Sequence, residues 1–476
     1  MISFRDPGGA LCRIGDRVLR IVAGGAPDLE AFLASSVAPK YFESGRVVRT
    51  VILTGAPAVE TLADLELKQS YDQLKGRMLV EHECLPLPSY PYEWPAEMLH
   101  AAGTLTLDLA QDLRPVGLGL KDATPLNVLF RGPQPVFIDL LSFERRDPRD
   151  PTWLPYAQFV RTFLLPLLAY KYFGTPLDQI MTARRDGLEP DEVYRYLGPV
   201  QRYLPPFLTL VSVPTWLAGR HDQDDNTIYQ RKLLEDPEKA AFIFDALLRR
   251  ARRTLNRLEP PVNRQSVWSD YMNAGGNNYD AQQFTSKETF VTEVVRTCAP
   301  KRVLDVGCNT GHFSFLAAKG GASVVALDYD PVVVGRVWCR ARSEKLDILP
   351  LVVNLARPSP GTGWRNEECP SFLDRARGKF DAVFMLAVLH HMLVSERVPL
   401  EKILDLAAEL TRDVLVIEYI GPEDSMFRRL TRGRDELHRD LTVAQFEAVC
   451  RAKFDIERSV QIPGGMRWLY LLRKRA

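Results

Sequence analysis

The sequence has few of the features that mark several common protein classes. It contains seven cysteines in 476 residues, and no two of them form a CxxC pair. A disulfide framework or a cysteine-based zinc site is therefore not expected. No stretch reaches 18 consecutive apolar residues, and the first residues contain no apolar core of signal-peptide length. These absences indicate a cytoplasmic protein that makes no membrane contact.

A dominant charge of either sign is also missing, because the formal net charge is only +1. A general electrostatic attraction to nucleic acid or to an anionic membrane is therefore not expected, and a nucleic-acid partner would have to meet a local basic patch. The chain is too long for one ordinary domain, and its 46% hydrophobic content is enough for two cores. The helix-breaking sequence Glu259–Val262, EPPV, predicts a boundary between domains 1–262 and 263–476.

The first of these domains reads as a mixture of strands and helices. Residues 10–22, ALCRIGDRVLRIV, predict a β-hairpin that turns at Gly15–Asp16. Further short strands are expected before residue 83, whereas residues 152–258 have mostly helical spacing of their apolar positions. An α+β fold is therefore predicted for this domain.

Polar residues stand at the ends of two short apolar strands in the segment GLGLKDATPLNVLFRGPQPVFIDLLSFE. Asp122 and Asn127 are five residues apart, and Asp139 ends the second strand. Asp122 is placed to orient an acceptor hydroxyl, while Asn127 and Asp139 offer oxygen ligands for Mg²⁺ beside the phosphates of a nucleotide. The simpler interpretation is that Asp122 and Asn127 only order a turn.

Strands and helices alternate through most of the second domain, from the strand at 302–306 to the strand at 413–419. Such alternation predicts a parallel sheet with helices on both faces. The chain then ends in two strands, 454–462 and 466–473, joined by Pro463–Gly465, which is typical of an antiparallel hairpin. A Rossmann-like, mostly parallel seven-stranded sheet with an antiparallel last strand is therefore expected.

A Gly-rich turn follows the first strand of this sheet, within VLDVGCNTGHFSF at residues 303–315. Glycines let the backbone approach a ligand, and the following helix directs free N–H groups to the same place. Asp328 ends the next strand, where an acid can accept hydrogen bonds from both hydroxyls of a ribose. The turn lacks the third glycine of GxGxxG, so a ligand without a pyrophosphate is favoured.

These motifs resemble those of class I S-adenosylmethionine-dependent methyltransferases. The resemblance rests on VLDVGCNTG, VVALDYD, the post-strand segment MLAVLHHM and the closing hairpin, in that order over residues 270–476. More narrowly, GTGWRNEE, LHHMLVSE, VIEYIGPEDSMF and RWLYLL resemble a bacterial group related to nodulation protein NoeA. The resemblance implies a Rossmann-like fold and S-adenosylmethionine as cofactor.

The resemblance also implies which residues surround that cofactor. They are Asp305, Gly307, Asn309, Gly311, Asp328, Asn354, Leu355 and Leu386. Among them Asp328 would hold the ribose, and Asn354 and Leu355 would flank the adenine. His390 and His391 are the candidate catalytic bases for a hydroxyl or amine acceptor, and a role in packing or loop ordering is the alternative for both.

The first domain resembles protein-kinase-like and aminoglycoside-phosphotransferase-like folds. KDATPLNVLF stands where those folds have their catalytic loop, and FIDLLSF where they have the metal-binding Asp. The resemblance implies Mg-ATP as a ligand of Asp122, Asn127 and Asp139. The chain departs from the family pattern because Leu120 replaces the loop histidine. In place of the family's nucleotide-binding lysine, Arg20 lies nearest, ahead of Lys68 and Lys75.

The two resemblances together predict an S-adenosylmethionine-dependent methyltransferase whose kinase-like first domain assists substrate or nucleotide binding. The alternatives are a bifunctional phosphotransferase and methyltransferase, and a non-catalytic regulatory protein that binds the cofactor. The sequence leaves the methyl acceptor open among small molecules, lipid-linked glycans, peptides and RNA.

Overall fold

The computed structural model describes residues 8–54, 78–218, 232–261, 265–266, 281–432, 438 and 440–475. Lys68 and Lys75 lie outside these residues. The chain divides into two compact units. Unit 1 comprises Met1–Tyr92, Ala96–Phe130 and Gln134–Pro261, and unit 2 comprises Glu93–Pro95, Arg131–Pro133 and Val262–Ala476.

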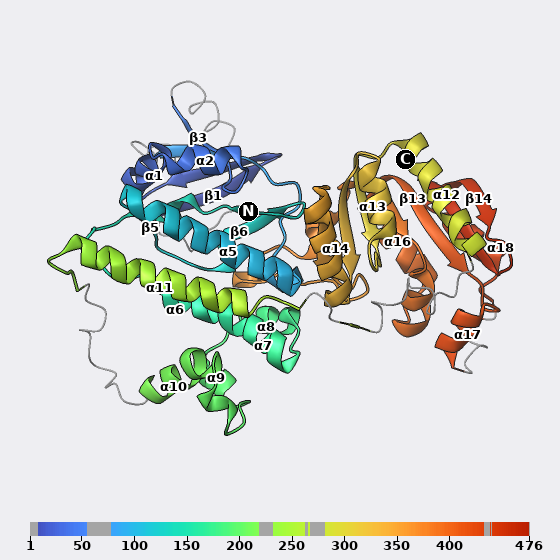
Figure 1. The fold of residues 1–476 in the computed structure, drawn as a ribbon. Coiled ribbons are helices and arrows are strands. Elements are labelled where there is room, and N and C mark those ends of the chain that lie inside the picture. The colour runs from blue at the N-terminus through green and yellow to red at the C-terminus, as the bar shows by residue number, and fades with distance from the viewer. Residues whose placement is uncertain are drawn as a thin grey trace. The chain divides into compact units, whose positions relative to one another are not determined.

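A four-stranded antiparallel sheet opens unit 1, in the order β1-β2-β4-β3 (Figure 1). The strands are β1 (Gly9–Ile14), β2 (Arg17–Val22), β3 (Thr50–Leu53) and β4 (Met78–His82). The expected hairpin is therefore present, with its turn at Gly15–Asp16. Two short antiparallel pairs follow, formed by β5 (Leu118–Leu120) with β8 (Phe143–Arg145) and by β6 (Val128–Arg131) with β7 (Gln134–Phe137).

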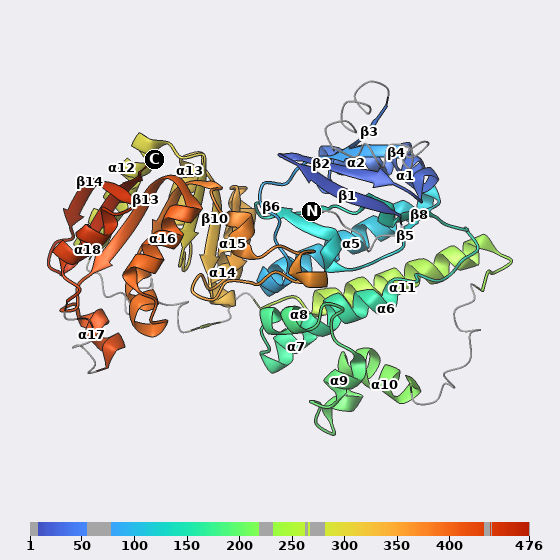
Figure 2. The same cartoon turned by 180° about the vertical axis from the view of Figure 1, so that it is seen from behind.

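Helices make up most of the remainder of unit 1. They are α1 (Ala26–Leu33), α2 (Val37–Glu43), α5 (Ala96–Leu113), α6 (Tyr156–Phe159), α7 (Leu165–Phe173), α8 (Leu177–Ala183), α9 (Pro190–Tyr194), α10 (Val213–Ala218) and α11 (Pro237–Arg257). Helix α5 is central, because twelve of its eighteen residues are buried. It lies beside α11, as both side views show (Figures 1 and 2).

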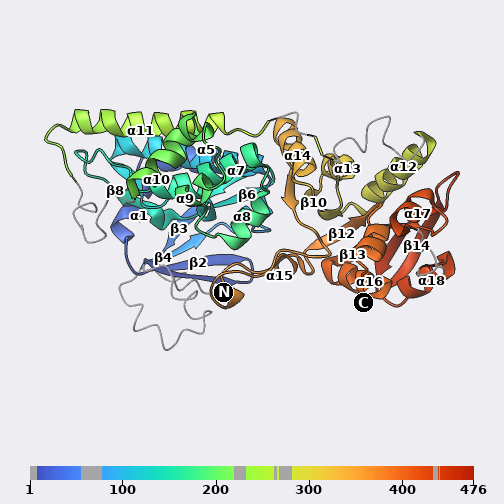
Figure 3. The ribbon, with the colours of Figure 1, turned by 90° about the horizontal axis from the view of Figure 1, so that it is seen from below.

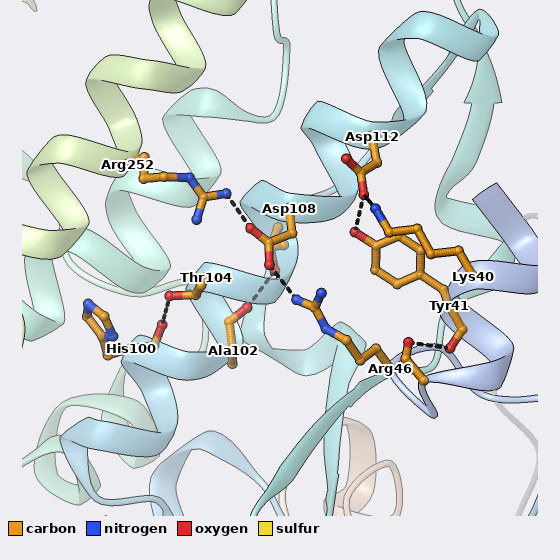
Figure 4. Close-up of polar contacts among 11 residues, drawn as sticks. Lys40, Tyr41, Arg46, His100, Ala102, Thr104, Asp108, Asp112 and Arg252 are labelled. Atoms are coloured by element: carbon orange, nitrogen blue, oxygen red, sulfur yellow. Dashed lines mark hydrogen bonds and ion pairs between the residues drawn. The ribbon is translucent and has the colours of Figure 1, made fainter.

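Two acids on the partly exposed face of α5 hold neighbouring segments in place (Figure 4). Asp108 accepts a hydrogen bond from Arg252 of α11 at 2.5 Å and also pairs with Arg46, which follows α2. One turn further on, Asp112 accepts from Lys40 at 2.6 Å and from the Tyr41 hydroxyl at 3.0 Å. These cross-links fix the register of α2 and α11 against α5.

A seven-stranded sheet forms the centre of unit 2, in the order β11-β10-β9-β12-β13-β15-β14. Strand β15 alone runs antiparallel to its two neighbours. The strands are β9 (Arg302–Val306), β10 (Ser323–Asp328), β11 (Ile348–Val352), β12 (Phe380–Met385), β13 (Thr411–Ile420), β14 (Phe454–Gln461) and β15 (Arg467–Lys474). The predicted mostly parallel sheet with an antiparallel last strand is confirmed.

Helices cover both faces of this sheet, as the view from below shows (Figure 3). The helices are α12 (Ala281–Cys298), α13 (His312–Lys319), α14 (Pro331–Glu344), α15 (Phe372–Ala376), α16 (Leu400–Leu410), α17 (Ser425–Thr431) and α18 (Val443–Cys450). The helices α12, α13 and α14 bury apolar side chains in one cluster with the sheet, and α16 packs on the opposite face with α18. This two-sided burial explains the nearly continuous apolar runs of β9, β10 and β13.

The α+β architecture expected for residues 1–262 is present in unit 1, and the doubly wound α/β sheet is present in unit 2. No helix among the described residues has both the length and the apolar character needed to cross a membrane.

Candidate functional site

A cavity of about 480 Å³ lies at the carboxyl ends of the parallel strands of unit 2. Segments that follow β9, β10, β11 and β12 line it, together with residues of α12, α13 and α17. Its volume is in the range of small-molecule sites, and apolar surface predominates on its walls. Ligands of open α/β sheets bind at this edge, because the strand-to-helix turns meet there.

The Gly-rich turn forms one wall of the cavity and depends on Gly307. This residue has φ of 70°, which side chains other than glycine rarely adopt, and a Cβ there would lie 2.2 Å from Val388 Cγ2. The N–H groups of Gly307 and Cys308 both donate to the Leu327 carbonyl oxygen at 2.8 Å. The turn is thus fastened to β10, and its backbone forms a surface that a side chain would block.

Asp328 connects the ends of the first two strand-to-helix turns. Its carboxylate accepts hydrogen bonds from the backbone N–H of Asn309 at 2.9 Å and of Asp330 at 3.1 Å. Burial raises the pKa of Asp328 to about 6, although these N–H groups act in the opposite direction. The side chain of Asp330 caps α14 by accepting from the Val332 N–H at 2.9 Å, as its position before that helix predicts.

A second buried acid, Asp305, lies at the base of the cavity on β9. Ser314 of α13 donates to Asp305 Oδ2 at 2.5 Å, and this bond ties the helix to the strand. Burial raises the pKa of Asp305 to about 6, and the Ser314 hydrogen bond opposes that shift. The base and one wall of the cavity therefore carry carboxyl groups that titrate close to neutrality, which suits a ligand with hydroxyl groups or positive charge.

A buried ion pair joins α12 to the sheet beside these acids. Lys287 Nζ lies 2.6 Å from Glu418 Oε2, and their side chains are 5% and 0% exposed. Arg467 Nη1 lies 3.9 Å from the other oxygen of Glu418, and Arg467 itself pairs with Asp424 at 2.8 Å. Lys287 also lines the cavity. An isolated buried charge is costly, so each charge of this group depends on the others.

The two histidines after β12 have different surroundings. His391 lines the cavity, whereas His390 is not among the described residues that do. The two ring centroids are 4.3 Å apart. Burial lowers the pKa of both imidazoles, most strongly for His390, where the neighbouring His391 adds to the shift. His390 Nδ1 is buried without a hydrogen-bond partner among the described residues. The neutral His391 is thus the better placed of the two to receive a proton.

Most of the residues predicted to bind the cofactor meet in the cavity. Those that line it are Asp305, Gly307, Asn309, Asp328, Asn354, Leu355 and Leu386. Gly311 is placed differently: it precedes α13 with φ of 82°, and a Cβ there would lie 2.9 Å from Val337 of α14. The absence of a side chain at Gly311 therefore permits the close packing of α13 against α14.

Sequence reasoning missed several residues that line the cavity. They are Phe284, Lys287, His312, Tyr329, Arg357, Met392 and Glu396. Phe284 and Lys287 belong to α12, which precedes the first strand of the sheet and carries no recognisable motif. The sequence offers one signal, which is that Lys287 stands three residues before the buried Phe290 and so falls on the side of α12 that faces the sheet. Arg357 and Glu396 pair at 2.8 Å, and Asn354 Nδ2 donates to the same Glu396 oxygen at 3.4 Å.

The predicted residues of unit 1 also come together, around the β6–β7 hairpin. The Asn127 carbonyl oxygen accepts from the Ile138 N–H at 2.9 Å, and Lys121 N–H donates to the Ser142 carbonyl at 2.7 Å. These bonds bring the Asp122 and Asn127 segment against the turn that begins at Asp139. Asp139 Oδ1 lies 2.7 Å from Arg20 Nη1 of β2.

A Mg²⁺ ion does not fit this arrangement as it stands. The ion needs about six oxygens at roughly 2.1 Å, whereas a guanidinium already holds one oxygen of Asp139. Among the described residues, no group of three or more His, Cys, Asp and Glu side chains is arranged to hold a metal ion.

The geometry of unit 2 defines a class of protein. A doubly wound sheet with a reversed last strand, a Gly-rich turn after its first strand and an acid after its second are features of class I S-adenosylmethionine-dependent methyltransferases. The family model described as "Methyltransferase domain" matches residues 279–447. The chain is an S-adenosylmethionine-dependent methyltransferase.

The particular family follows from a relative that matches along the whole chain. Nodulation protein NoeA of Rhizobium meliloti (strain 1021) is 30% identical over 475 residues, which cover 99% of this chain and 95% of that protein. The chain belongs to the family of nodulation protein NoeA.

Solved structures are similar to parts of the chain. One is the N-methyltransferase NodS from Bradyrhizobium japonicum WM9 in complex with S-adenosyl-L-homocysteine, at 15% identity and a TM-score of 0.33, covering 44% of this chain and 95% of that one. Another is the bifunctional kinase-methyltransferase WbdD, at 18% identity and a TM-score of 0.31, covering 44% of this chain and 43% of that one.

Proposed function

We propose that unit 2 binds S-adenosylmethionine in the cavity at the carboxyl edge of its sheet and methylates a nucleophile that approaches beside His391. The observation that carries this proposal is the meeting of Gly307, Asp328 and His391 on one cavity, from turns that follow three different strands. Residues so far apart in sequence converge at this edge because the strands that precede them are parallel.

The cofactor, when bound, supplies an electrophilic methyl group on a sulfonium sulfur. Asp328 accepts hydrogen bonds from the ribose hydroxyls, since its two backbone bonds fix the carboxylate in advance. Asn354 and Leu355, which follow β11, flank the adenine. Gly307 leaves the room that the rest of the cofactor occupies, because no side chain projects there.

The role of the remaining groups follows from the needs of methyl transfer. An in-line displacement requires alignment of the two reacting atoms above all, and the rigid turns after β9 and β12 provide it. His391 accepts the proton of a hydroxyl or amine acceptor at a ring nitrogen, because burial keeps its imidazole neutral at physiological pH. His390, packed against it, holds the orientation of the ring.

We further propose that unit 1 assists by binding the acceptor or a nucleotide at the Asp122, Asn127 and Asp139 segment. The hydrogen bonds that bring these three residues to one end of the β6–β7 hairpin support this role. Polar side chains on loops that a rigid hairpin positions are typical of binding sites.

Calorimetric titration of the full chain with S-adenosyl-L-homocysteine tests the cofactor site. We expect Asp328→Asn to weaken binding at least about a hundredfold, because two charge-assisted hydrogen bonds are lost. Asp381→Asn is a matched control, since Asp381 also accepts two backbone N–H groups, from Lys301 and Arg302, but at the amino end of the sheet. Equal affinity in the two variants would contradict the assignment.

A further inference from the structure

The cation beside Asp139 is part of the chain itself. Arg20 lies on β2, and the pairing of Arg20 with Val80 and of Val18 with His82 places Arg20 and His82 on the same face of the sheet. The side chains of Arg20 and Asp139 are 11% and 27% exposed, and their charged atoms are 2.7 Å apart. A short and mostly buried guanidinium–carboxylate contact of this kind is a strong one.

The buried side chain of His82 lies close enough to Arg20 to be affected by its charge. The Thr50 hydroxyl donates to the Val48 carbonyl at 3.2 Å, so its oxygen accepts from His82 Nδ1–H at 2.7 Å. Burial, together with the smaller effect of the Arg20 charge, lowers the pKa of His82 to about 4. His82 is therefore neutral, and its buried Nε2 has no partner among the described residues.

Lys121, next to Asp122, also has partners within the protein. Lys121 Nζ donates to the Leu141 carbonyl at 3.1 Å and lies 3.8 Å from Asp28. Asn127 Nδ2 is buried and has no hydrogen-bond partner among the described residues. A divalent ion at Asp139 would also meet the positive charge of Arg20 within a few ångströms, which disfavours it electrostatically.

We propose that Arg20 is the resident cation of this site and holds Asp139 in the position where a divalent ion would otherwise bind. Unit 1 then binds its ligand without a metal ion at Asp139. Removal of the guanidinium leaves the Asp139 carboxylate, the Asp122 carboxylate and the His82 Nε2 lone pair to a metal ion. This inference concerns unit 1 alone, and a failure of cofactor binding in unit 2 would leave it unaffected.

Titration of the full chain with Mn²⁺, followed by the electron paramagnetic resonance signal of the free ion, tests the proposal. Mn²⁺ serves as the probe because it accepts the same oxygen ligands as Mg²⁺. We expect the wild type and Asp139→Asn to bind the same amount of Mn²⁺. Arg20→Met should bind Mn²⁺ at least about tenfold more tightly than the wild type, since a neighbouring cation is worth at least one power of ten in affinity.

The matched control is Arg17→Met on the same strand. Arg17 pairs with Glu81 at 2.8 Å, and its position three residues before Arg20 directs it to the other face. This variant loses an ion pair of β2 without opening the site, so its Mn²⁺ titration should equal that of the wild type. A gain in Arg20→Met that Asp139→Asn abolishes in the double variant supports the proposal.

Two results would overturn it. One is Mn²⁺ binding by the wild type that disappears in Asp139→Asn, because the carboxylate would then be open to a metal ion despite Arg20. The other is an Arg20→Met variant that melts cooperatively and still binds no more Mn²⁺ than the wild type. If Arg20→Met does not fold, the comparison of the wild type with Asp139→Asn decides between the two outcomes.

Discussion

Asp328 ends strand β10 in unit 2 and Asp139 follows strand β7 in unit 1, but different groups hold their carboxylates. Two backbone N–H groups contact Asp328, and a full guanidinium cation contacts Asp139. An N–H group carries only a partial charge, so most of the negative charge of Asp328 is left for a ligand. The charge of Asp139 is already balanced by Arg20.

The same contrast holds for the groups around these acids. The Lys287–Glu418 pair beside the cavity of unit 2 is almost fully buried. In unit 1, acids such as Asp108 keep about a third of their side chain exposed. An acid in a strand-to-loop turn is therefore a poor indicator of ligand binding until its partner is known, because the partner decides whether the charge is available.

The contrast in burial predicts its largest effect for Lys287→Met. This change removes the nearest described cation of the buried Glu418, and it should lower the free energy of unfolding by about 3–5 kcal/mol. Urea unfolding monitored by circular dichroism measures it. Arg458→Met is the control, because Arg458 also pairs with α12, through Glu293, but at the surface. It should cost less than about 1 kcal/mol. Similar losses in both variants would remove the distinction.

The state of Asp328 predicts a pH dependence of cofactor binding. Its raised pKa of about 6 means that the carboxylate is ionised above pH 7 and becomes protonated as the pH falls through 6. Affinity for S-adenosyl-L-homocysteine should therefore be constant above pH 7 and fall by about tenfold per pH unit below 6. The stability of the unliganded protein should change with pH in the opposite direction. A carboxyl group with a raised pKa contributes stability at about pH 4, and this contribution is lost as the pH rises through 6.

Calorimetric titrations from pH 7.5 to pH 5 measure this dependence. Asp381→Asn should keep the same profile, because Asp381 lies at the opposite end of the sheet from the cavity. A flat profile between pH 7 and 5 would show that an ionised Asp328 is not needed for binding.

The smallest effect is expected in unit 1, at the partly exposed ion pairs of α5 (Figure 4). Asp108→Asn weakens the contacts to both Arg46 and Arg252. Because solvent screens such pairs, the loss of unfolding free energy should be only about 1 kcal/mol. Thermal unfolding at low and at high salt measures it, and the difference from the wild type should shrink at high salt. A loss as large as that of Lys287→Met would mean that burial does not decide how much these ion pairs contribute to the free energy of unfolding.

The sequence predicts the parts of the fold and site that depend on local patterns. Gly307 and Asp328 stand in recognisable strand-to-helix turns, so their meeting follows from the rule that parallel strands end at the same edge. The Lys287–Glu418 and Arg20–Asp139 pairs could not be predicted, because their members are 131 and 119 residues apart. Their contact depends on how a helix or a strand without any motif packs. The π-helix His391–Ser395, which His390 precedes, was likewise not predicted from the sequence.

The buried charge of Glu418 sets the limits of the smallest fragment that can carry the cavity. Among the described residues, cations reach Glu418 from α12, before the first strand of the sheet, and from β15, after all the other strands. A fragment that begins at β9, or one that ends with α18, keeps every parallel strand next to the cavity but leaves this carboxylate with one cation fewer. The matched family region, 279–447, also ends before β15. Excision of the methyltransferase unit should therefore retain both ends of the sequence from α12 to β15.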